Sequence, residues 1–480
     1  MRVPASMRFT AAVLAIGSML AAALWSAAPG SASALRWRNC LNGLQCTTIE
    51  VPVDYAKPDG AVWTIPVSRY PAATQPAPRG AILLNEGGPG LPGLAASGYK
   101  KAWSRLHEQY DMIGFDPRGT GSSVPAIECL TDRQKERIRG QVSAPTTAEQ
   151  RRTARRLGRL QGQMCQKKWG EYLPHVGTEN VARDMDRIRE ALGMAKISYM
   201  GFSYGTFLGA VYANLFPGRT DRVILDSAMN PALGYVALRR DQAEEQNVMQ
   251  GRFLRDCLKH RDCPFTSASQ GRRFIAGLVA RLDSQPYRRG DRKLSGSRAI
   301  GLMESANYSP ASLWPNLRRV LAAAVRGNLR PMLRAAYSDA QMVNPADSQY
   351  LDVVCTDFQQ TRKPRRPQRL APRWQRIAPF SGANRAWSLQ PCETWPVAPV
   401  RKPHPIRARG SGPILVTGNR FDPATPITWS RALGRQLRHA RFLAVREQGH
   451  LSWWTNRCAR ARMTRFMLTG DRPAPGTVCR

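Results

Sequence analysis

One serine of this chain, Ser203, stands between two glycines in the pentapeptide Gly-Phe-Ser-Tyr-Gly. The spacing matches the G-x-S-x-G pattern, in which a sharp turn between a strand and a helix exposes a nucleophilic serine. Residues 197–200 are apolar like a buried strand, and apolar residues recur at helical spacing after the turn. The same residues could form an ordinary structural turn. Nucleophilic chemistry also requires a base, an acid that orients the base, and donors for an oxyanion.

Among the six histidines, His450 is the best candidate for the base. It follows the strand-like run FLAVREQG, and loops that follow parallel strands lie at the edge of the sheet where such folds keep their sites. Asp422 follows a second strand-like run, PILVTG, and is the candidate acid. The order Ser203, Asp422, His450 is the order of the triad in α/β-hydrolases. Asp226, at the end of the run VILD, remains the alternative acid.

The donors of an oxyanion hole are backbone N–H groups that point at the developing negative charge. We expect one donor from Tyr204, the residue after the candidate nucleophile. The other is expected from the loop NEGGPGLPG, in which Gly87 and Gly88 would let the backbone approach a substrate closely.

The elements that must position these residues alternate between strand-like and helical patterns. Buried strands are predicted at the start of segments 80–90 and 110–123 and within 222–227. A helix is predicted over 178–193 with Thr178 as its N-cap. This alternation predicts a mostly parallel sheet and, with the order of the candidate triad, an α/β-hydrolase fold.

The pattern changes after residue 228, and the chain is expected to have two core segments separated by a cap. Residues 35–228 and 406–480 are predicted to form the core, and 229–405 a large, mostly helical cap inserted between them. Within the cap, the apolar run DVVCTD at 352–357 is the first that looks like a buried strand. A Pro- and Arg-rich stretch before residue 412 is expected to act as a linker.

The N-terminus has the pattern of a secretory signal peptide. Arg2 and Arg8 precede or border an apolar run over 9–25, and Ala-Ser-Ala follows at 32–34, so cleavage is expected before Leu35. A membrane anchor is the alternative, although the run is short for a span. No later stretch is long and apolar enough to cross a bilayer, and we expect a secreted protein.

The cysteine count is even, as expected for a protein of an oxidising compartment. No pair forms a C-x-x-C redox or zinc motif, and neither a metal nor another cofactor is predicted. Connectivity does not follow from sequence alone, and pairing of neighbours is only the simplest choice. That choice gives the pairs Cys40–Cys46, Cys129–Cys165, Cys257–Cys263, Cys355–Cys392 and Cys458–Cys479.

The formal net charge of +37 is high enough to suggest an anionic partner. The basic residues are spread along the chain and show no recognition-helix, zinc-finger or interleaved aromatic pattern, which argues against specific nucleic-acid binding. Loose electrostatic contact with an anionic cell surface is the remaining expectation, beside the simpler interpretation that arginine covers the solvated faces.

Five ordered motifs together resemble a known family: LLNEGGPG, YDMIGFDPRGTGSS, GFSYGT, GNRFDPATP and GHLSWW with two later cysteines. The chain resembles, over nearly all of its mature length, the secreted tripeptidyl aminopeptidases of actinomycetes. These are α/β-hydrolases related to prolyl aminopeptidases, with a TAP-like C-terminal segment. The resemblance implies a serine peptidase that releases tripeptides from free N-termini, with Ser203 as nucleophile, Asp422 as acid and His450 as base. The family's loop usually reads Asn-Pro-Gly-Gly-Pro-Gly, and here Glu86 replaces the proline.

A peptidase that recognises a free N-terminus needs a carboxylate for the substrate ammonium. The candidates are Glu86, Glu244, Glu245 and Glu304. The main alternative function is a carboxylesterase or lipase, which would use the same triad on a small ester. A non-catalytic surface-binding protein is a minor alternative, because binding does not require all members of a triad.

Overall fold

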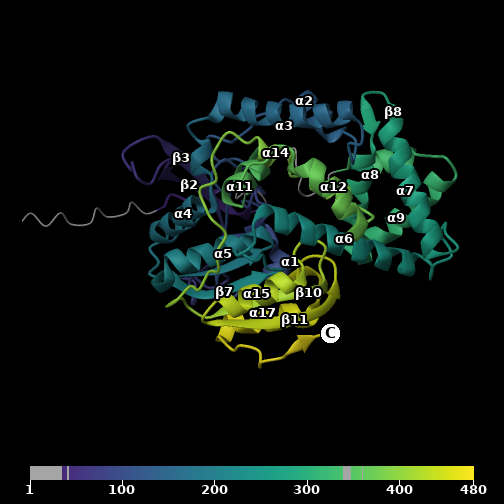
Figure 1. Ribbon diagram of the computed structural model, residues 1–480. Helices are drawn as coiled ribbons and strands as arrows, with labels where there is room; N and C mark the ends of the chain where they lie inside the picture. Colours follow the sequence, from purple (N-terminus) through teal and green to yellow (C-terminus); the bar gives the residue numbers. More distant parts are fainter. Residues whose placement is uncertain (1–34, 41–42, 339–347, 359–360) are drawn as a thin grey trace, which may run out of the picture. The chain divides into compact units, whose positions relative to one another are not determined.

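A mixed sheet runs through the protein, whose computed structural model describes residues 35–40, 43–338, 348–358 and 361–480 (Figure 1). Within these residues the strands pair in the order β1-β2-β3-β5-β4-β6-β7-β10-β11-β12. The ladders from β5 through β12 are parallel, and those that join β1, β2, β3 and β5 are antiparallel. The predicted mostly parallel sheet is therefore confirmed. The predicted signal segment, 1–34, lies outside the described residues.

The strands of this sheet are β1 (Arg38–Asn39), β2 (Gln45–Pro52), β3 (Val62–Tyr70), β4 (Ala81–Asn85), β5 (Asp111–Phe115), β6 (Ile197–Phe202), β7 (Thr220–Asp226), β10 (Ile414–Phe421), β11 (Ala440–Gln448) and β12 (Val478–Cys479). The central strands are apolar at consecutive positions because both faces of the sheet are covered. Side chains alternate between the faces, so in β4 Leu83 joins one core cluster and Ile82 and Leu84 join another.

Helices cover both faces of the sheet. On the face of Leu83 lie α4 (Thr178–Ala191), α5 (Tyr204–Leu215) and α15 (Ile427–Gln436), whose apolar residues share its cluster. On the face of Ile82 lie α1 (Lys100–Trp103), α16 (Ser452–Thr455) and α17 (Arg457–Thr469). This doubly wound arrangement brings the carboxyl ends of the parallel strands together at one edge, where ligands bind in open α/β sheets.

A long helical segment lies between β7 and β10 (Figure 1). It has its own core, which includes Phe253, Leu278 and Leu321. Its elements are α6 (Tyr235–Cys257), α7 (Ala268–Ser284), β8 (Tyr287–Arg289), β9 (Arg292–Leu294), α8 (Gly296–Ala306), α9 (Pro310–Val325), α10 (Arg330–Ala335), α11 (Ser348–Asp357), α12 (Arg366–Ile377), α13 (Gly382–Trp387) and α14 (Gln390–Glu393).

An earlier pair of helices joins this helical segment. The pair consists of α2 (Asp132–Arg139) and α3 (Ala148–Trp169), which lie before the elbow in the chain. Gly158 of α3 lies against Gln390 of α14, where an added Cβ would come within 3.2 Å of the Gln390 side chain. The helical region beside the sheet is therefore built from two parts of the sequence, α2 and α3 before the elbow and the segment between β7 and β10.

Two local predictions were wrong. The apolar run DVVCTD does not form a strand but lies within helix α11, because a short apolar run fits a buried helix as well as a buried strand. Thr178 is not the N-cap of α4 but its first residue, after Gly177. Its backbone N–H is instead satisfied by Asp357 Oδ2 at 2.8 Å, a partner from α11 that the sequence pattern could not reveal.

The five predicted disulfides are confirmed. They join Cys40–Cys46, Cys129–Cys165, Cys257–Cys263, Cys355–Cys392 and Cys458–Cys479. Cys355 of α11 and Cys392 of α14 link two helices of the inserted segment, and Cys458 of α17 fixes the last strand, β12. The pairing of neighbours succeeds because each pair sits within one locally folded segment. None of the described helices is both long enough and apolar enough for a membrane span.

Candidate active site

Ser203 occupies a strained turn between β6 and α5. Its backbone has φ 55° and ψ −121°, a conformation that non-glycine residues rarely adopt and that is typical of a nucleophile elbow. The Ser203 N–H donates to the carbonyl oxygen of Asp226 at 3.0 Å, which ties the turn to the neighbouring strand β7. Gly201 has no room for a side chain, because a Cβ there would lie 2.3 Å from the Gly205 carbonyl oxygen. The two glycines of the motif are thus required by close backbone approach.

The glycine-rich loop after β4 lies directly against this turn. A Cβ at Gly87 would lie 2.4 Å from the Phe202 carbonyl oxygen and 3.0 Å from the Tyr204 nitrogen. The Gly87 N–H donates to Asn85 Oδ1 at 3.0 Å, so it is already engaged. The Gly88 N–H has no hydrogen-bond partner among the described residues, and Gly88 lines the cavity described below.

Tyr204 contributes its backbone rather than its side chain to this region. Its N–H lies at the first position of α5, where the helix dipole favours negative charge. The phenol is buried on the other side and shares a hydrogen bond with Thr178 Oγ1 at 2.6 Å. The candidate donors near Ser203 are therefore the Gly88 N–H of the loop and the Tyr204 N–H at the start of α5.

His450 and Asp422 form a buried pair. Both Asp422 oxygens lie 2.9 Å from His450 Nδ1. Asp422 is 0% exposed and His450 is 6% exposed. Asp422 also accepts from the backbone N–H groups of Ala424 and Thr425, both at 2.9 Å, and from Thr425 Oγ1 at 3.0 Å. These donors fix the orientation of the carboxylate. With its Nδ1 proton directed at Asp422, the imidazole keeps Nε2 available to accept a proton.

The alternative acid, Asp226, has a different set of partners. Its Oδ1 accepts from the Ser452 N–H at 3.1 Å and from Thr417 Oγ1, and its Oδ2 accepts from the Trp453 N–H at 2.8 Å. These groups belong to β10 and to the first turn of α16, directly after His450. Asp226 thus fixes the segment that carries the histidine, and Asp422 is the carboxylate in contact with the imidazole.

The helical segment contacts His450 directly. The His450 N–H donates to the Tyr308 carbonyl oxygen at 2.8 Å, and the two rings meet edge to face with centroids 5.2 Å apart. Tyr308 lies between α8 and α9. A backbone hydrogen bond therefore joins the helical segment to the loop that carries His450.

A cavity of about 510 Å³ contains Ser203 and His450 in its lining. Its other walls come from the glycine-rich loop, from α2 and α3, and from helices of the inserted segment. Cavities of this size hold ligands as large as a short peptide. The cavity therefore brings together Ser203, Gly88 and the imidazole that Asp422 contacts.

Of the predicted ammonium-binding carboxylates, Glu86 and Glu304 line the cavity. Glu304 is already neutralised, because Arg385 Nε and Nη2 donate to its two oxygens at 2.9 and 2.5 Å. Glu86 has no cationic partner among the described residues and accepts from the Tyr99 hydroxyl. Burial raises the pKa of the Glu86 carboxyl, against the effect of the Tyr99 hydrogen bond.

The other two candidate glutamates do not line the cavity. Glu244 is exposed and pairs with Arg240 at 2.9 Å on the surface of α6. Glu245 lies nearer the site: burial, with a smaller contribution from the charge of Asp422, raises its pKa to about 7. Their adjacent positions on one helix give them different environments, which the sequence could not separate.

Several residues of the site were missed by the sequence analysis. Thr425 stands at the third position after Asp422, a spacing at which a hydroxyl and an amide commonly bond back to an aspartate, so a signal was present. Tyr308, Arg385 and Arg239 line the cavity from the cap, and nothing in their local sequence distinguishes them from other residues of solvated helices.

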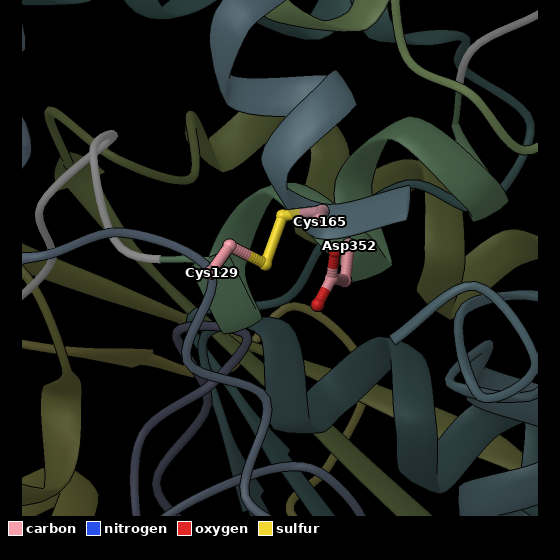
Figure 2. Close-up of side chains that lie close together, drawn as sticks. All are labelled: Cys129, Cys165 and Asp352. Atoms are coloured by element: carbon pink, nitrogen blue, oxygen red, sulfur yellow. A yellow bond between two sulfur atoms is a disulfide. The ribbon is translucent and has the colours of Figure 1, made fainter. Parts of the chain in front are cut away.

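A separate cluster of Cys129, Cys165 and Asp352 brings potential metal ligands together (Figure 2). The two sulfur atoms are joined in a disulfide, so neither is a thiolate that could bind a metal. Burial raises the pKa of the Asp352 carboxyl well above its ordinary value and favours its neutral form. The cluster is therefore not suited to a metal ion in the oxidised protein.

Comparisons with known proteins identify the family. Residues 378–479 match a family model described as TAP-like protein. Serine protease Hip1 of Mycobacterium tuberculosis is 33% identical over 463 residues, which cover 91% of this chain and 87% of that protein. The chain belongs to the TAP-like family of α/β-hydrolases. The family resemblance inferred from the five motifs is confirmed, and the protein is a serine hydrolase.

Two further relatives of this TAP-like chain carry different names. Tripeptidyl aminopeptidase of Streptomyces coelicolor is 29% identical over 476 residues, or 95% of this chain and 87% of that protein. Carboxylesterase B of Mycobacterium tuberculosis is 30% identical over 477 residues, or 94% of this chain and 91% of that protein. The family therefore includes proteins named as peptidases and as an esterase.

Proposed function

We propose that the protein is a secreted exopeptidase that releases short peptides, such as tripeptides, from free N-termini. The observation that carries the proposal is Glu86, a half-buried carboxylate without a cationic partner among the described residues, in the same cavity as Ser203 and His450. A substrate ammonium would supply the missing charge. Relatives named serine protease and tripeptidyl aminopeptidase support peptide cleavage, and five disulfides are typical of an oxidising compartment outside the cytoplasm.

In this mechanism Ser203 Oγ attacks the substrate carbonyl while His450 Nε2 accepts the hydroxyl proton. Asp422 keeps the imidazole oriented and stabilises its positive charge. The N–H groups of Tyr204 and Gly88 hold the oxyanion. His450 then gives the proton to the leaving amine as the C–N bond breaks, leaving an acyl-enzyme. Water, deprotonated by His450, attacks this ester and restores the Ser203 hydroxyl.

The test compares two peptide amides, which differ only at the N-terminus, with an ester. The purified protein is incubated with a fluorogenic tripeptide amide with a free amine, the N-acetylated amide and a short-chain ester. We expect cleavage of the free-amine peptide and a loss of at least about 10³-fold in kcat for Ser203→Ala. Cleavage of both peptide amides at similar rates would contradict recognition of the N-terminus.

The ammonium site is tested with Glu86→Gln and a matched control, Glu244→Gln. We expect Glu86→Gln to raise KM for the free-amine peptide about tenfold or more, as for loss of a charge-assisted hydrogen bond, and to leave the ester unaffected. Glu244 is exposed and paired with Arg240, so its variant should behave as the unmodified protein. An unchanged KM in Glu86→Gln would remove Glu86 from this role.

The second candidate function is a carboxylesterase. It is favoured by the esterase-named relative at 30% identity, and an ester would use the same serine, histidine and N–H donors. Ester cleavage that depends on Ser203, with no cleavage of either peptide amide, would decide for the esterase.

A further inference from the structure

One buried arginine of the cavity, Arg239, donates hydrogen bonds only to neutral groups. Arg239 of α6 lines the cavity and is 6% exposed. Its Nε donates to Ser388 Oγ at 2.9 Å and its Nη1 to Gln242 Oε1 at 2.8 Å. Among the described residues no carboxylate lies within ion-pair distance of Arg239, and its Nη2 has no hydrogen-bond partner.

Two other arginines of the same cavity are paired with carboxylates. Arg385 forms its two hydrogen bonds to Glu304, and Arg298 Nη2 lies 2.5 Å from Glu136 Oε2. Burying a cation without a counter-ion is costly, and an arginine cannot lose its proton to avoid that cost. An anion that enters the cavity would therefore gain more at Arg239 than at its paired neighbours.

Hydrogen bonds connect Arg239 to the loop that carries Asp422. Gln242, which accepts from Arg239, donates from Nε2 to the Ala424 carbonyl oxygen at 2.8 Å, and the Ala424 N–H donates to Asp422 Oδ1 at 2.9 Å. Ala424, Arg239 and His450 line the same cavity. Arg239 thus lies on the same side of the cavity as His450. The leaving group of a substrate lies on this side too, because the imidazole delivers its proton to it.

We propose that Arg239 determines specificity by binding a carboxylate of the substrate, a role that rests on the proposed hydrolysis at Ser203. The planar guanidinium is suited to carboxylates, and Nη2 has both hydrogens to donate. The carboxylate is either the C-terminus of a short peptide or an acidic side chain. With Glu86 for an ammonium, the cavity of about 510 Å³ has a group for each end of a short zwitterionic peptide.

The experiment measures binding without turnover, in the Ser203→Ala protein. Isothermal titration compares Ala-Ala-Ala-Ala as free acid and as C-terminal amide, and Ala-Ala-Glu-Ala-amide with Ala-Ala-Gln-Ala-amide. The same four affinities are measured after Arg239→Gln, and after Arg240→Gln as the matched control. Arg240 is the next residue on α6, is exposed and pairs with Glu244 at the surface. Thermal unfolding of each variant checks that it folds.

We expect at least one anionic probe to bind about tenfold or more tightly than its neutral partner, and Arg239→Gln to abolish that ratio while Arg240→Gln preserves it. Loss of the acid-to-amide ratio assigns Arg239 to the C-terminus, and loss of the Glu-to-Gln ratio assigns it to an acidic side chain. Arg239→Lys, which keeps the charge without the planar fork, should give an intermediate ratio. Where the peptides bind, a preference that survives Arg239→Gln, or equal affinities for each anionic and neutral pair before the substitution, would overturn the proposal.

A pair of activated esters separates this inference from the peptidase proposal. Mono-4-nitrophenyl glutarate carries a free carboxylate and 4-nitrophenyl butyrate does not. The hydrolysis of both esters is measured with the protein that keeps Ser203. If no peptide is bound but the ratio of kcat/KM for the two esters falls at least about tenfold in Arg239→Gln, Arg239 binds carboxylates and the peptidase proposal fails. An unchanged ester ratio together with no peptide binding overturns the role of Arg239.

Discussion

At the scale of single residues, two buried aspartates near His450 have different partners and should respond differently to substitution. Asp422 contacts the imidazole, and Asp226 holds the Ser452 and Trp453 N–H groups of the following turn. Both are fully buried at the ends of neighbouring strands. The contact with the histidine, rather than burial, separates a positioning acid from a structural one.

Asp422→Asn is expected to lower kcat about 10³- to 10⁴-fold with little loss of stability, because an amide cannot hold the imidazolium in the same way. Asp226→Asn should instead lower the free energy of unfolding by about 1–3 kcal/mol, because the amide NH₂ would face buried donors. Steady-state kinetics and thermal unfolding of both variants test this. Full stability with abolished activity in Asp226→Asn would make Asp226 the acid.

The Glu86 carboxyl gives the proposed peptidase a specific pH dependence. Burial raises its pKa, and only the ionised form attracts a substrate ammonium. As the pH falls, Glu86 therefore becomes protonated at a higher pH than an ordinary glutamate. The ratio of kcat/KM for the free-amine peptide to that for the N-acetylated peptide should decrease over this range. Taking the ratio removes every effect of pH that the two substrates share. In Glu86→Gln the ratio should be low and independent of pH. A ratio independent of pH in the unmodified protein would argue against this role of Glu86.

At the scale of elements, the turn between β11 and α16 links the sheet to the cap. Gly449 has φ +101°, and a Cβ there would lie 2.7 Å from Pro310 Cδ and 2.8 Å from the Tyr308 carbonyl oxygen. The next residue is His450, whose N–H is held by that same Tyr308. The cap therefore restricts the position of the histidine loop, although Tyr308 lies 105 residues after Ser203 in the sequence.

Gly449→Ala is expected to lower kcat on the order of 100-fold, because the added methyl would displace His450 from the cap and from Ser203. The control is Gly290→Ala in the β8–β9 turn, which also has positive φ, +56°, but has no atom within 4 Å of an added Cβ. It should reduce stability slightly and leave kcat unchanged. Equal kinetic effects in the two variants would show that backbone strain alone, rather than the contact with Tyr308, is responsible.

At the scale of the whole molecule, the formal net charge of +37 is the dominant surface property. Many of the arginines lie on solvated helix faces; on α3, Arg152, Arg156 and Arg159 are exposed one turn apart. Such a charge distribution favours non-specific attraction to anionic surfaces.

We expect the protein to bind vesicles of phosphatidylcholine with phosphatidylglycerol at low ionic strength and not to bind vesicles of pure phosphatidylcholine. In 1 M NaCl the Debye length falls to about 3 Å, and the binding should be lost. Co-sedimentation over a salt series measures this, with turnover of the ester as a check that the protein stays folded. Binding to both kinds of vesicle, or binding that persists at high salt, would contradict a purely electrostatic contact.

The sequence by itself determined the features that depend on short stretches of chain. The Gly-Phe-Ser-Tyr-Gly turn is such a feature, since backbone approach at Gly201 permits no side chain. The parallel sheet was also predictable from the alternation of strand and helix patterns. Pairing neighbouring cysteines was only the simplest choice, and it agrees with the five disulfides of the structure. The family followed from five motifs in order along the chain.

Only the tertiary structure decided which of several equivalent side chains meet. Asp422 and Asp226 both end strands, and only the loop geometry brings one of them to His450. Glu304 became a poor candidate for binding a substrate ammonium because Arg385, 81 residues later, neutralises it. The helical state of DVVCTD was set by its packing in the core. Arg239 gave no signal in the sequence, because an uncompensated charge is a property of everything around a residue. Pairing, burial and the absence of a counter-ion depend on contacts between distant segments, which local patterns do not encode.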